Sequence, residues 1–188
     1  MCKYRFFWQT KNVFQEEIIN CIFAENYSEM IIRKGEKKDM NAVLELIQEL
    51  ATFENEPDAV VVTVDDLIQD GFGANPLFYT FVAELDEEIV GIALYYYRYS
   101  TWKGKTIHLE DLIVKEKMRG SGLGFALYSE IIAQGKRDHV RRIEWAVLDW
   151  NTPAIDFYKK SGAKVLDDWL VAQMDEDGIE AFLKNNSK

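Results

Sequence analysis

The sequence predicts a single mixed α/β domain in which helices cover a central sheet. Three observations support this fold class. The 188 residues, 48% of them hydrophobic, are enough for one real core and argue against disorder. From Met30 onward, strand-like and helix-like runs follow in the order β-α-α-β-β-β-α-β-α-β. No internal repeat or low-complexity linker interrupts that order.

The first half of this pattern contains a strand, two helices and a hairpin. Residues 30–35 (MIIRKG) form a short apolar run with strand character. Asp39 can cap a helix whose apolar residues recur at i, i+3, i+4 and i+7. Thr63 opens a second helix that Gly71 closes. Two β-rich runs, 77–85 and 88–100, are separated by a charged turn and therefore predict a hairpin.

The second half continues with two more strands and two more helices. A strand is expected over 105–116, a helix over 125–138 and another strand over 140–149. Thr152 then caps a helix that has Pro153 at its first position and ends at Gly162. The remaining runs predict late strands at 163–167 and 168–175 and an end helix at 178–185.

Residues 1–29 do not fit this pattern and lack clear helix caps. We therefore expect an N-terminal extension over 1–29, a domain over 30–188, and Met30 as the natural start. No apolar run is long enough to span a membrane, and no basic leader precedes one, so a cytoplasmic protein is expected.

The charge and cysteine content exclude several classes of function. A formal net charge of −10 disfavours nucleic acids and anionic membranes and suits a cationic small molecule, although acidic surfaces often serve solubility alone. The only cysteines, Cys2 and Cys21, cannot form a disulfide framework, and no CxxC or HExxH spacing occurs. No metal site is therefore expected.

A glycine-rich stretch, KMRGSGLGFA, lies between a predicted strand and a predicted helix. The first amides of a helix lack intrahelical partners and carry the positive end of the helix dipole, which suits phosphate oxygens. Arg119 adds a fixed positive charge. The P-loop pattern is absent, and Phe125 occupies the last glycine position of the dinucleotide fingerprint. By itself the stretch fits a structural turn as well as an anion site.

The surrounding segments favour the anion site, because together they resemble the Gcn5-related N-acetyltransferase (GNAT) family. The spacing Arg119, Gly122, Gly124 resembles its acetyl-CoA pyrophosphate loop, and LEDLIV resembles the strand before that loop. Segments 66–84, 95–114, 119–124 and 146–151 resemble the spermidine/spermine (diamine) N-acetyltransferase group. Segments 100–111 and 146–151 are most similar to its thialysine branch. The resemblance covers about residues 30–174.

This resemblance implies a twisted, mostly antiparallel mixed sheet flanked by helices, with a splayed strand pair forming the CoA cleft. It implies acetyl-CoA as cosubstrate and a homodimer. The residues expected to contact the cofactor are Leu112, Ile113, Val114, Arg119, Gly120, Ser121, Gly122, Leu123, Gly124, Asn151 and Tyr158.

The resemblance also implies roles in direct acetyl transfer to an amine. Glu110 is the expected general base, through a water molecule, and Tyr158 the acid that protonates the CoA thiolate. Backbone amides around Leu112 to Val114 would polarise the thioester carbonyl. No covalent acyl-enzyme is expected, because both cysteines precede the motifs.

Acidic and aromatic side chains are the expected contacts for a cationic amine. The candidates are Glu54, Trp102, Glu110, Asp111 and Trp169. Trp102 and Trp169 fit packing or a dimer interface equally well, and His108 is given a structural role. The expected substrate is a small polyamine, diamine or thialysine/lysine-like primary amine. The alternatives are a peptide or protein N-acetyltransferase and a non-catalytic acetyl-CoA-binding module.

Overall fold

The computed structural model describes residues 30–186, and these fall into two compact units that divide between Ala146 and Val147. The predicted extension over 1–29, with both cysteines, lies outside the described residues. The strands are β1 (Met30–Lys34), β2 (Tyr79–Leu85), β3 (Glu88–Ser100), β4 (Gly104–Val114) and β5 (Ile143–Glu144). The helices are η1 (Lys37–Asp39), α2 (Met40–Phe53), α3 (Val64–Phe72), η2 (Glu116–Met118), α4 (Leu123–Arg137), α5 (Thr152–Lys160) and α6 (Glu176–Asn186).

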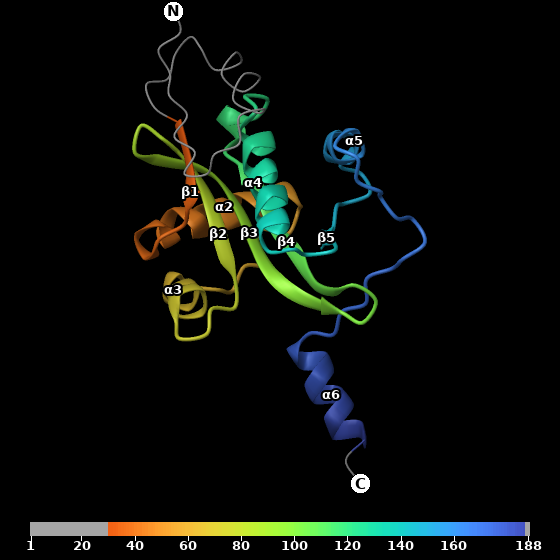
Figure 1. The fold of residues 1–188 in the computed structure, drawn as a ribbon. Helices are drawn as coiled ribbons and strands as arrows, with labels where there is room; N and C mark the ends of the chain where they lie inside the picture. The colour runs from red at the N-terminus through yellow and green to blue at the C-terminus, as the bar shows by residue number, and fades with distance from the viewer. Residues whose placement is uncertain (1–29, 187–188) are drawn as a thin grey trace, which may run out of the picture. The chain divides into compact units, whose positions relative to one another are not determined.

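The first unit is built on a five-stranded sheet whose strands follow the chain order β1-β2-β3-β4-β5. The first four strands are antiparallel, and β5 runs parallel to β4. Helix α4 lies in front of this sheet in Figure 1, and α2 lies behind it. The predicted mixed, mostly antiparallel sheet flanked by helices is therefore confirmed.

Each face of the sheet has its own apolar layer. On the α2 face, Met40, Val43 and Leu46 pack in one buried cluster with residues of the strands, among them Ile92 and Ile113. On the α4 face the helix approaches so closely that a Cβ at Gly91 would lie 3.1 Å from Leu127 Cδ1. That approach explains why β3 carries a glycine in its interior.

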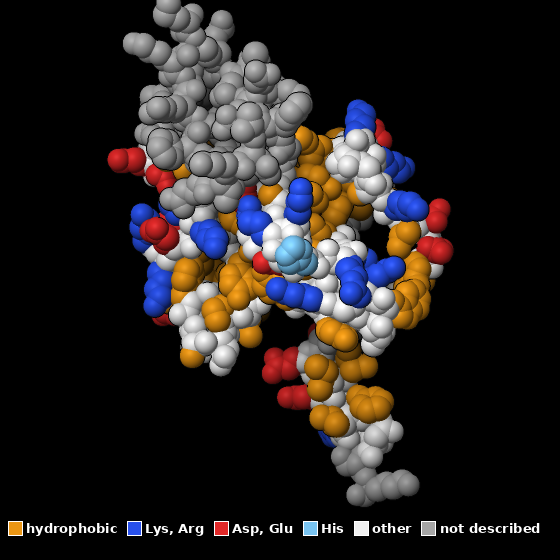
Figure 2. Space-filling view, viewed as in Figure 1, with side chains coloured by type: hydrophobic (Ala, Val, Ile, Leu, Met, Phe, Trp, Pro, Cys, Tyr) orange, Lys and Arg blue, Asp and Glu red, His pale blue; other side chains and the backbone are white. Residues whose placement is uncertain are grey.

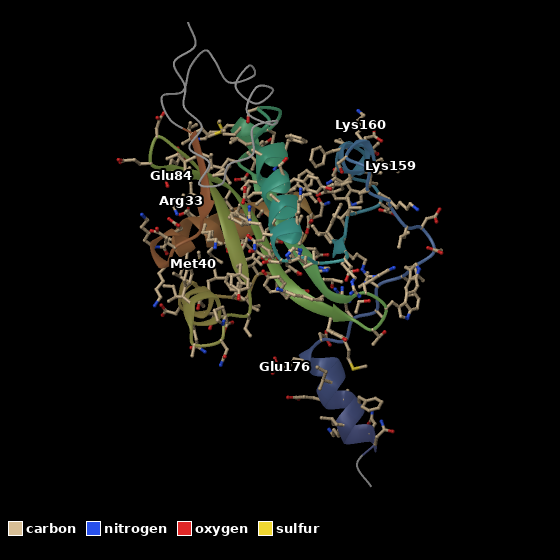
Figure 3. The ribbon with its side chains drawn as sticks, viewed as in Figure 1. Arg33, Met40, Glu84, Lys159, Lys160 and Glu176 are labelled. Atoms are coloured by element: carbon tan, nitrogen blue, oxygen red, sulfur yellow. The ribbon has the colours of Figure 1, made fainter. Side chains whose placement is uncertain are left out.

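Helix α2 begins where the sequence predicts, but Asp39 does not cap it through its side chain. The Asp39 carboxylate instead accepts hydrogen bonds from Arg33 Nη1 and Nη2 (2.6 and 2.9 Å) and from the Glu36 amide (2.7 Å). Arg33 Nε also donates to Glu84 (2.6 Å), and these two residues lie side by side on β1 and β2 in Figure 3. Asp39 thus ties the start of α2 to the edge of the sheet.

Replacing Asp39 by Asn should lower the free energy of unfolding at pH 7 by about 2 kcal/mol, because it removes two charge-assisted hydrogen bonds and leaves Glu84 as the remaining anionic partner of Arg33. Burial raises the pKa of Asp39, but hydrogen bonds from Arg33 and Glu36 lower the pKa overall below 3.8. The carboxylate therefore contributes stability above pH 4, and this contribution is lost as the pH falls further. Urea denaturation at several pH values measures both effects. The exposed control Asp58→Asn should change little, and an equal loss in both variants contradicts the account.

Most of the other predicted boundaries in the first unit are confirmed with small shifts, and one strand is much shorter than predicted. Thr63 forms a capping box with Asp66, but α3 continues through Gly71 to Phe72. The β2–β3 hairpin turns at Asp86 and Glu87, both with positive φ. The strand predicted over 140–149 is much shorter, because only Ile143 and Glu144 pair with β4.

The second unit departs further from the sequence prediction. Asn151, rather than Thr152, is the N-cap of α5, and its side chain accepts from the Ala154 amide (3.3 Å). The prediction of two late strands over 163–175 is wrong, because those residues form neither strand nor helix. A strand needs a partner strand for its backbone groups, and none occurs in the described part of this unit. Helix α6 carries exposed hydrophobic side chains, visible in orange in Figure 2.

Candidate active site

The central feature of the first unit is a β-bulge in β4. Leu94 of β3 pairs with Asp111, and Tyr95 pairs with Leu109, so Glu110 has no partner residue opposite it. A bulge changes the direction of the side chains and increases the local twist, and bulges are frequent beside active sites. The bulge places the predicted base at an irregular point of an otherwise regular strand.

Beyond the bulge, one edge of β4 is open. Strand β5 pairs with β4 only at Ile107 and His108 among the described residues. From Leu109 to Val114 that edge of β4 therefore has no neighbouring strand in the described part of the chain. This is the splayed arrangement that the sequence resemblance predicts.

The backbone amides that face this edge can be identified from the ladder. Lys115 donates its amide N–H to the Val90 carbonyl (2.9 Å). In an antiparallel pair the amides of alternate residues face the partner strand. The Ile113 amide therefore faces β3, while the Leu112 and Val114 amides face the open edge. These two amides are available to a ligand along β4, and the Ile113 amide is used within the sheet.

The glycine-rich stretch forms the turn that leads into α4. Gly120 and Gly122 have φ values of 76° and 89°, which side chains rarely adopt. A Cβ at Gly124 would meet only Val114 Cγ2, at 3.9 Å, so packing does not require glycine there. The first helical hydrogen bond runs from the Ala126 amide to the Gly122 carbonyl (3.0 Å). The amides of Leu123, Gly124 and Phe125 precede it at the N-terminus of the helix, which suits an anion.

Two side chains of this turn already have partners within the unit. The Ser121 hydroxyl donates to the Met118 carbonyl (2.6 Å) and holds the turn closed. The Arg119 guanidinium lies over the Phe53 ring at 4.8 Å and is 3.7 Å from Glu49 Oε1. The predicted cofactor cation thus packs against the end of α2.

Three carboxylates interact around the bulge. Burial raises the pKa of Asp111 to about 6, and the charges of Glu110 and Glu54 add to this shift. Desolvation also raises the pKa of Glu54, which lies at the C-cap of α2. Asp111 therefore lies within range of the charges of Glu110 and Glu54, and these three of the five predicted amine-binding residues are called the acidic cluster below.

Two polar groups contact Glu110 from the sheet. His108 Nε2 lies 3.4 Å from Glu110 Oε2. Burial raises the pKa of Tyr96, and the charge of Glu110 and a hydrogen bond with it raise that pKa further. Glu110 is half exposed, so one side of the carboxylate faces solvent while the other faces these two rings.

The other predicted residues belong to the β3–β4 turn and to the second unit. Trp102 is exposed on the β3–β4 turn, and the stretch of β4 from Gly104 to Glu110 is roughly 20 Å long at 3.3 Å per residue. Asn151, Tyr158 and Trp169 belong to the second unit, in which Tyr158 is buried and Trp169 exposed. The roles predicted for these four residues stay predictions.

No helix within residues 30–186 is long and apolar enough to cross a membrane. No group of three or more His, Cys, Asp or Glu side chains in the same range could hold a metal ion.

A comparison with protein families matches residues 40–163 to the acetyltransferase (GNAT) family. The chain belongs to the GNAT family. Bovine (Bos taurus) thialysine N-epsilon-acetyltransferase is 38% identical over 145 residues, which cover 73% of this chain and 85% of that protein. Human spermidine/spermine N(1)-acetyltransferase-like protein 1 is 37% identical over 139 residues, or 70% of this chain and 20% of that protein.

Solved structures show the same GNAT fold. An integron cassette protein from V. cholerae superimposes with a TM-score of 0.68 at 20% identity, over 82% of this chain and 98% of that chain. Aminoglycoside N-acetyltransferase AAC(6')-Iy in complex with CoA superimposes with a TM-score of 0.63 at 17% identity, over 79% of this chain and 96% of that chain. At these identities the likeness concerns the fold alone.

Proposed function

We propose that this GNAT protein transfers an acetyl group from acetyl-CoA to a primary amine of a small polyamine, diamine or thialysine/lysine-like substrate. The observation that carries the proposal is that Glu110 and Asp111 lie on the stretch of β4 that β5 does not pair with, where the charge of Glu54 also acts on Asp111. The thialysine and spermidine/spermine acetyltransferase relatives support this choice of substrate. Amine-dependent release of CoA from acetyl-CoA is the direct test, and no release with any amine contradicts the proposal.

Acetyl-CoA would bind through backbone groups more than through side chains. The amides at the start of α4, beside Gly122 and Gly124, suit the pyrophosphate. Leu112 and Val114 would present their amides to the pantetheine arm and the thioester carbonyl. Binding would also draw Arg119 from its contact with Glu49, since a pyrophosphate offers a stronger anionic partner.

The acidic cluster addresses the proton problem of the reaction. A lysine-like amine has a pKa of about 10.4 and is a cation at neutral pH, so it must lose a proton before it attacks. Asp111 and Glu54 would attract the ammonium group, and Glu110 would accept the proton through water. The amine nitrogen then attacks the thioester carbon, the carbon–sulfur bond breaks, and Tyr158 protonates the departing thiolate. The attacking nitrogen gives up its second proton to water, and water returns a proton to the Tyr158 phenolate. The role of Tyr158 rests on the sequence resemblance.

Replacing Glu110 by Gln should flatten the acidic limb of the kcat profile and lower kcat about tenfold at pH 7, because the variant has no carboxylate to accept the proton. Steady-state rates with saturating acetyl-CoA and amine, measured from pH 5.5 to 9, check this expectation. A profile that matches the wild type in shape and height removes Glu110 as the base.

Replacing Asp111 by Asn should act on amine binding instead. Because the pKa of Asp111 is about 6, the carboxyl is anionic above this pH and neutral below it. The wild-type KM for the amine should therefore rise as the pH falls through 6. At pH 8 the KM of Asp111→Asn should be about tenfold higher than that of the wild type, because one charged contact is lost. The KM of this variant should not rise as the pH falls through 6. A variant whose KM still rises near pH 6 would assign that titration to another group.

The domain boundary and the assembly complete the proposal. We propose that residues 30–188 form the acetyltransferase domain, that the protein works in the cytoplasm, and that it forms a homodimer. Exposed hydrophobic residues at the C-terminal end, among them Trp169, Leu170 and Val171, are consistent with such an interface. Sedimentation of the full chain tests the dimer.

A further inference from the structure

The contacts around His108 indicate more than a structural role. The ring is mostly buried, packs against Tyr96 at a centroid distance of 5.1 Å, and presents its two nitrogens to different partners. Nδ1 lies 3.3 Å from Arg98 Nη1, and Nε2 lies 3.4 Å from Glu110 Oε2. His108 thus lies between a fixed cation and the predicted catalytic carboxylate.

These contacts determine which nitrogen carries the proton. A guanidinium group has five N–H donors and no acceptor. The Nδ1 atom that faces Arg98 must therefore be the acceptor, and the proton of the neutral ring lies on Nε2. Burial and the charge of Arg98 lower the pKa of His108, while the charges of Glu110 and Glu144 raise it. The net pKa lies below 6.5. At neutral pH the ring is neutral, with its N–H directed at Glu110.

Arg98 is itself held by a group from the neighbouring strand. Its Nη1 lies 2.9 Å from Glu144 Oε1 on β5, and Glu144 Oε2 lies 2.9 Å from Arg142 Nε. Glu144 pairs with His108 in the register, and this is the last pair between β4 and β5. The Arg98–Glu144 ion pair therefore joins β3 to β5 across β4 at the end of the β4–β5 pairing. The charged groups that face His108 are therefore Arg98 on β3, Glu144 on β5 and Glu110 on its own strand.

We propose that His108 is a positioning residue that orients Glu110 for proton transfer, with its tautomer fixed by Arg98. The proposal rests on the proposed amine acetyltransferase function. Glu110 lies on a bulge and is half exposed, so without a partner its carboxylate would sample several rotamers. The Nε2–H and the Tyr96 hydroxyl restrict it from the protein side and leave the other side for water and amine. The 3.4 Å contact is long, and such contacts shorten in many active sites when substrate binds.

The test replaces His108 in two ways and measures kcat and KM at pH 7.5. His108→Phe keeps a ring against Tyr96 but removes both polar contacts. It should lower kcat about tenfold, which is the effect of losing one hydrogen bond to a charged group, and leave the KM for acetyl-CoA unchanged. His108→Gln can accept from Arg98 and donate to Glu110, so it should restore kcat to within about threefold of the wild type. His139→Asn, at the other histidine, is the matched control. His139 is exposed and has a positive φ, which Asn tolerates.

A double-mutant cycle separates positioning from packing. If His108 acts through Glu110, adding His108→Phe to Glu110→Gln should cause no further loss in kcat. Equal losses in His108→Phe and His108→Gln, or additive losses in the double variant, overturn the proposal.

Arg98→Gln provides a second test if His108→Phe does not fold. Arg98 is half exposed, and without it the tautomer of His108 is no longer fixed. Arg98→Gln should lower kcat about threefold in the wild type, while unchanged turnover contradicts the tautomer argument. A wild-type protein that acetylates no amine contradicts the proposed function itself.

Discussion

Replacing Gly122 by Asn should weaken acetyl-CoA binding about 100-fold, the loss of two charge-assisted hydrogen bonds of about 1.5 kcal/mol each. Gly122 is the N-cap of α4 with a φ of 89°, directly before the amides proposed to hold the pyrophosphate. Asn tolerates left-handed backbone better than other side chains, so the variant should keep the turn. Its side chain would then occupy the space that the phosphate oxygens need. Isothermal calorimetry with acetyl-CoA measures the effect.

Gly104 offers a matched control for this experiment. It has a φ of 78° on the β3–β4 turn, and no atom lies within 4 Å of its added Cβ. Gly104→Asn therefore introduces the same residue in the same backbone conformation far along β4 from the loop. It should leave acetyl-CoA affinity within about twofold of the wild type, as expected of a surface substitution away from the site. If Gly122→Asn binds acetyl-CoA with wild-type affinity, the glycine-rich stretch is a structural turn and does not bind the cofactor.

Replacing Tyr158 by Phe should lower kcat about 100-fold while the dissociation constant of acetyl-CoA changes little, because only the proton donor is lost. The CoA thiolate would then leave without receiving a proton from the protein. Single-turnover rates and calorimetry on the same preparation separate turnover from binding. Tyr158 is buried, so thermal unfolding must show that the variant is folded before the rates are compared.

Tyr99 supplies the matched control for the loss of a phenol. It is 81% exposed at the far end of β3, and Tyr99→Phe should leave both turnover and acetyl-CoA affinity unchanged. A folded Tyr158→Phe variant with wild-type turnover would mean that another group, or water, protonates the thiolate.

Much of the fold was predictable because local chemistry determines it. Thr63 opens α3 as predicted, through a capping box with Asp66, and the Asp86–Glu87 turn separates two strands of strong β character. Asp39 was placed correctly at the start of α2, but its partner Arg33 was not predicted. Such a pairing depends on how β1 lies beside the helix, which short-range patterns do not encode.

The late strands were predicted for a different reason and were wrong. The segment from Trp169 to Met174 is apolar enough for a strand, but a strand requires a partner for its backbone groups, and that requirement is not local. The shortening of the strand around Ile143 has the same origin, because β5 pairs with β4 over two residues only.

In the site, the residue types were predictable and the arrangement was not. Glu110 and Asp111 could be selected from the LEDLIV motif by resemblance. The bulge that separates their environments has no sequence signal in this strand, since it contains neither Gly nor Pro near Glu110. The contact of His108 with Glu110 was missed because the prediction gave that histidine a structural role.

The measurement that tests the central claim most directly is CoA release from acetyl-CoA with a panel of amines. The panel contains spermidine, putrescine, thialysine and a lysine-containing peptide, each compared at equal concentration and pH. We expect kcat/KM to be at least about tenfold higher for one of the three small amines than for the peptide, because free cationic groups can approach Glu54, Glu110 and Asp111. A preference for the peptide would favour a protein acetyltransferase. Acetyl-CoA binding without amine-dependent release would favour a binding module, and either result contradicts the account.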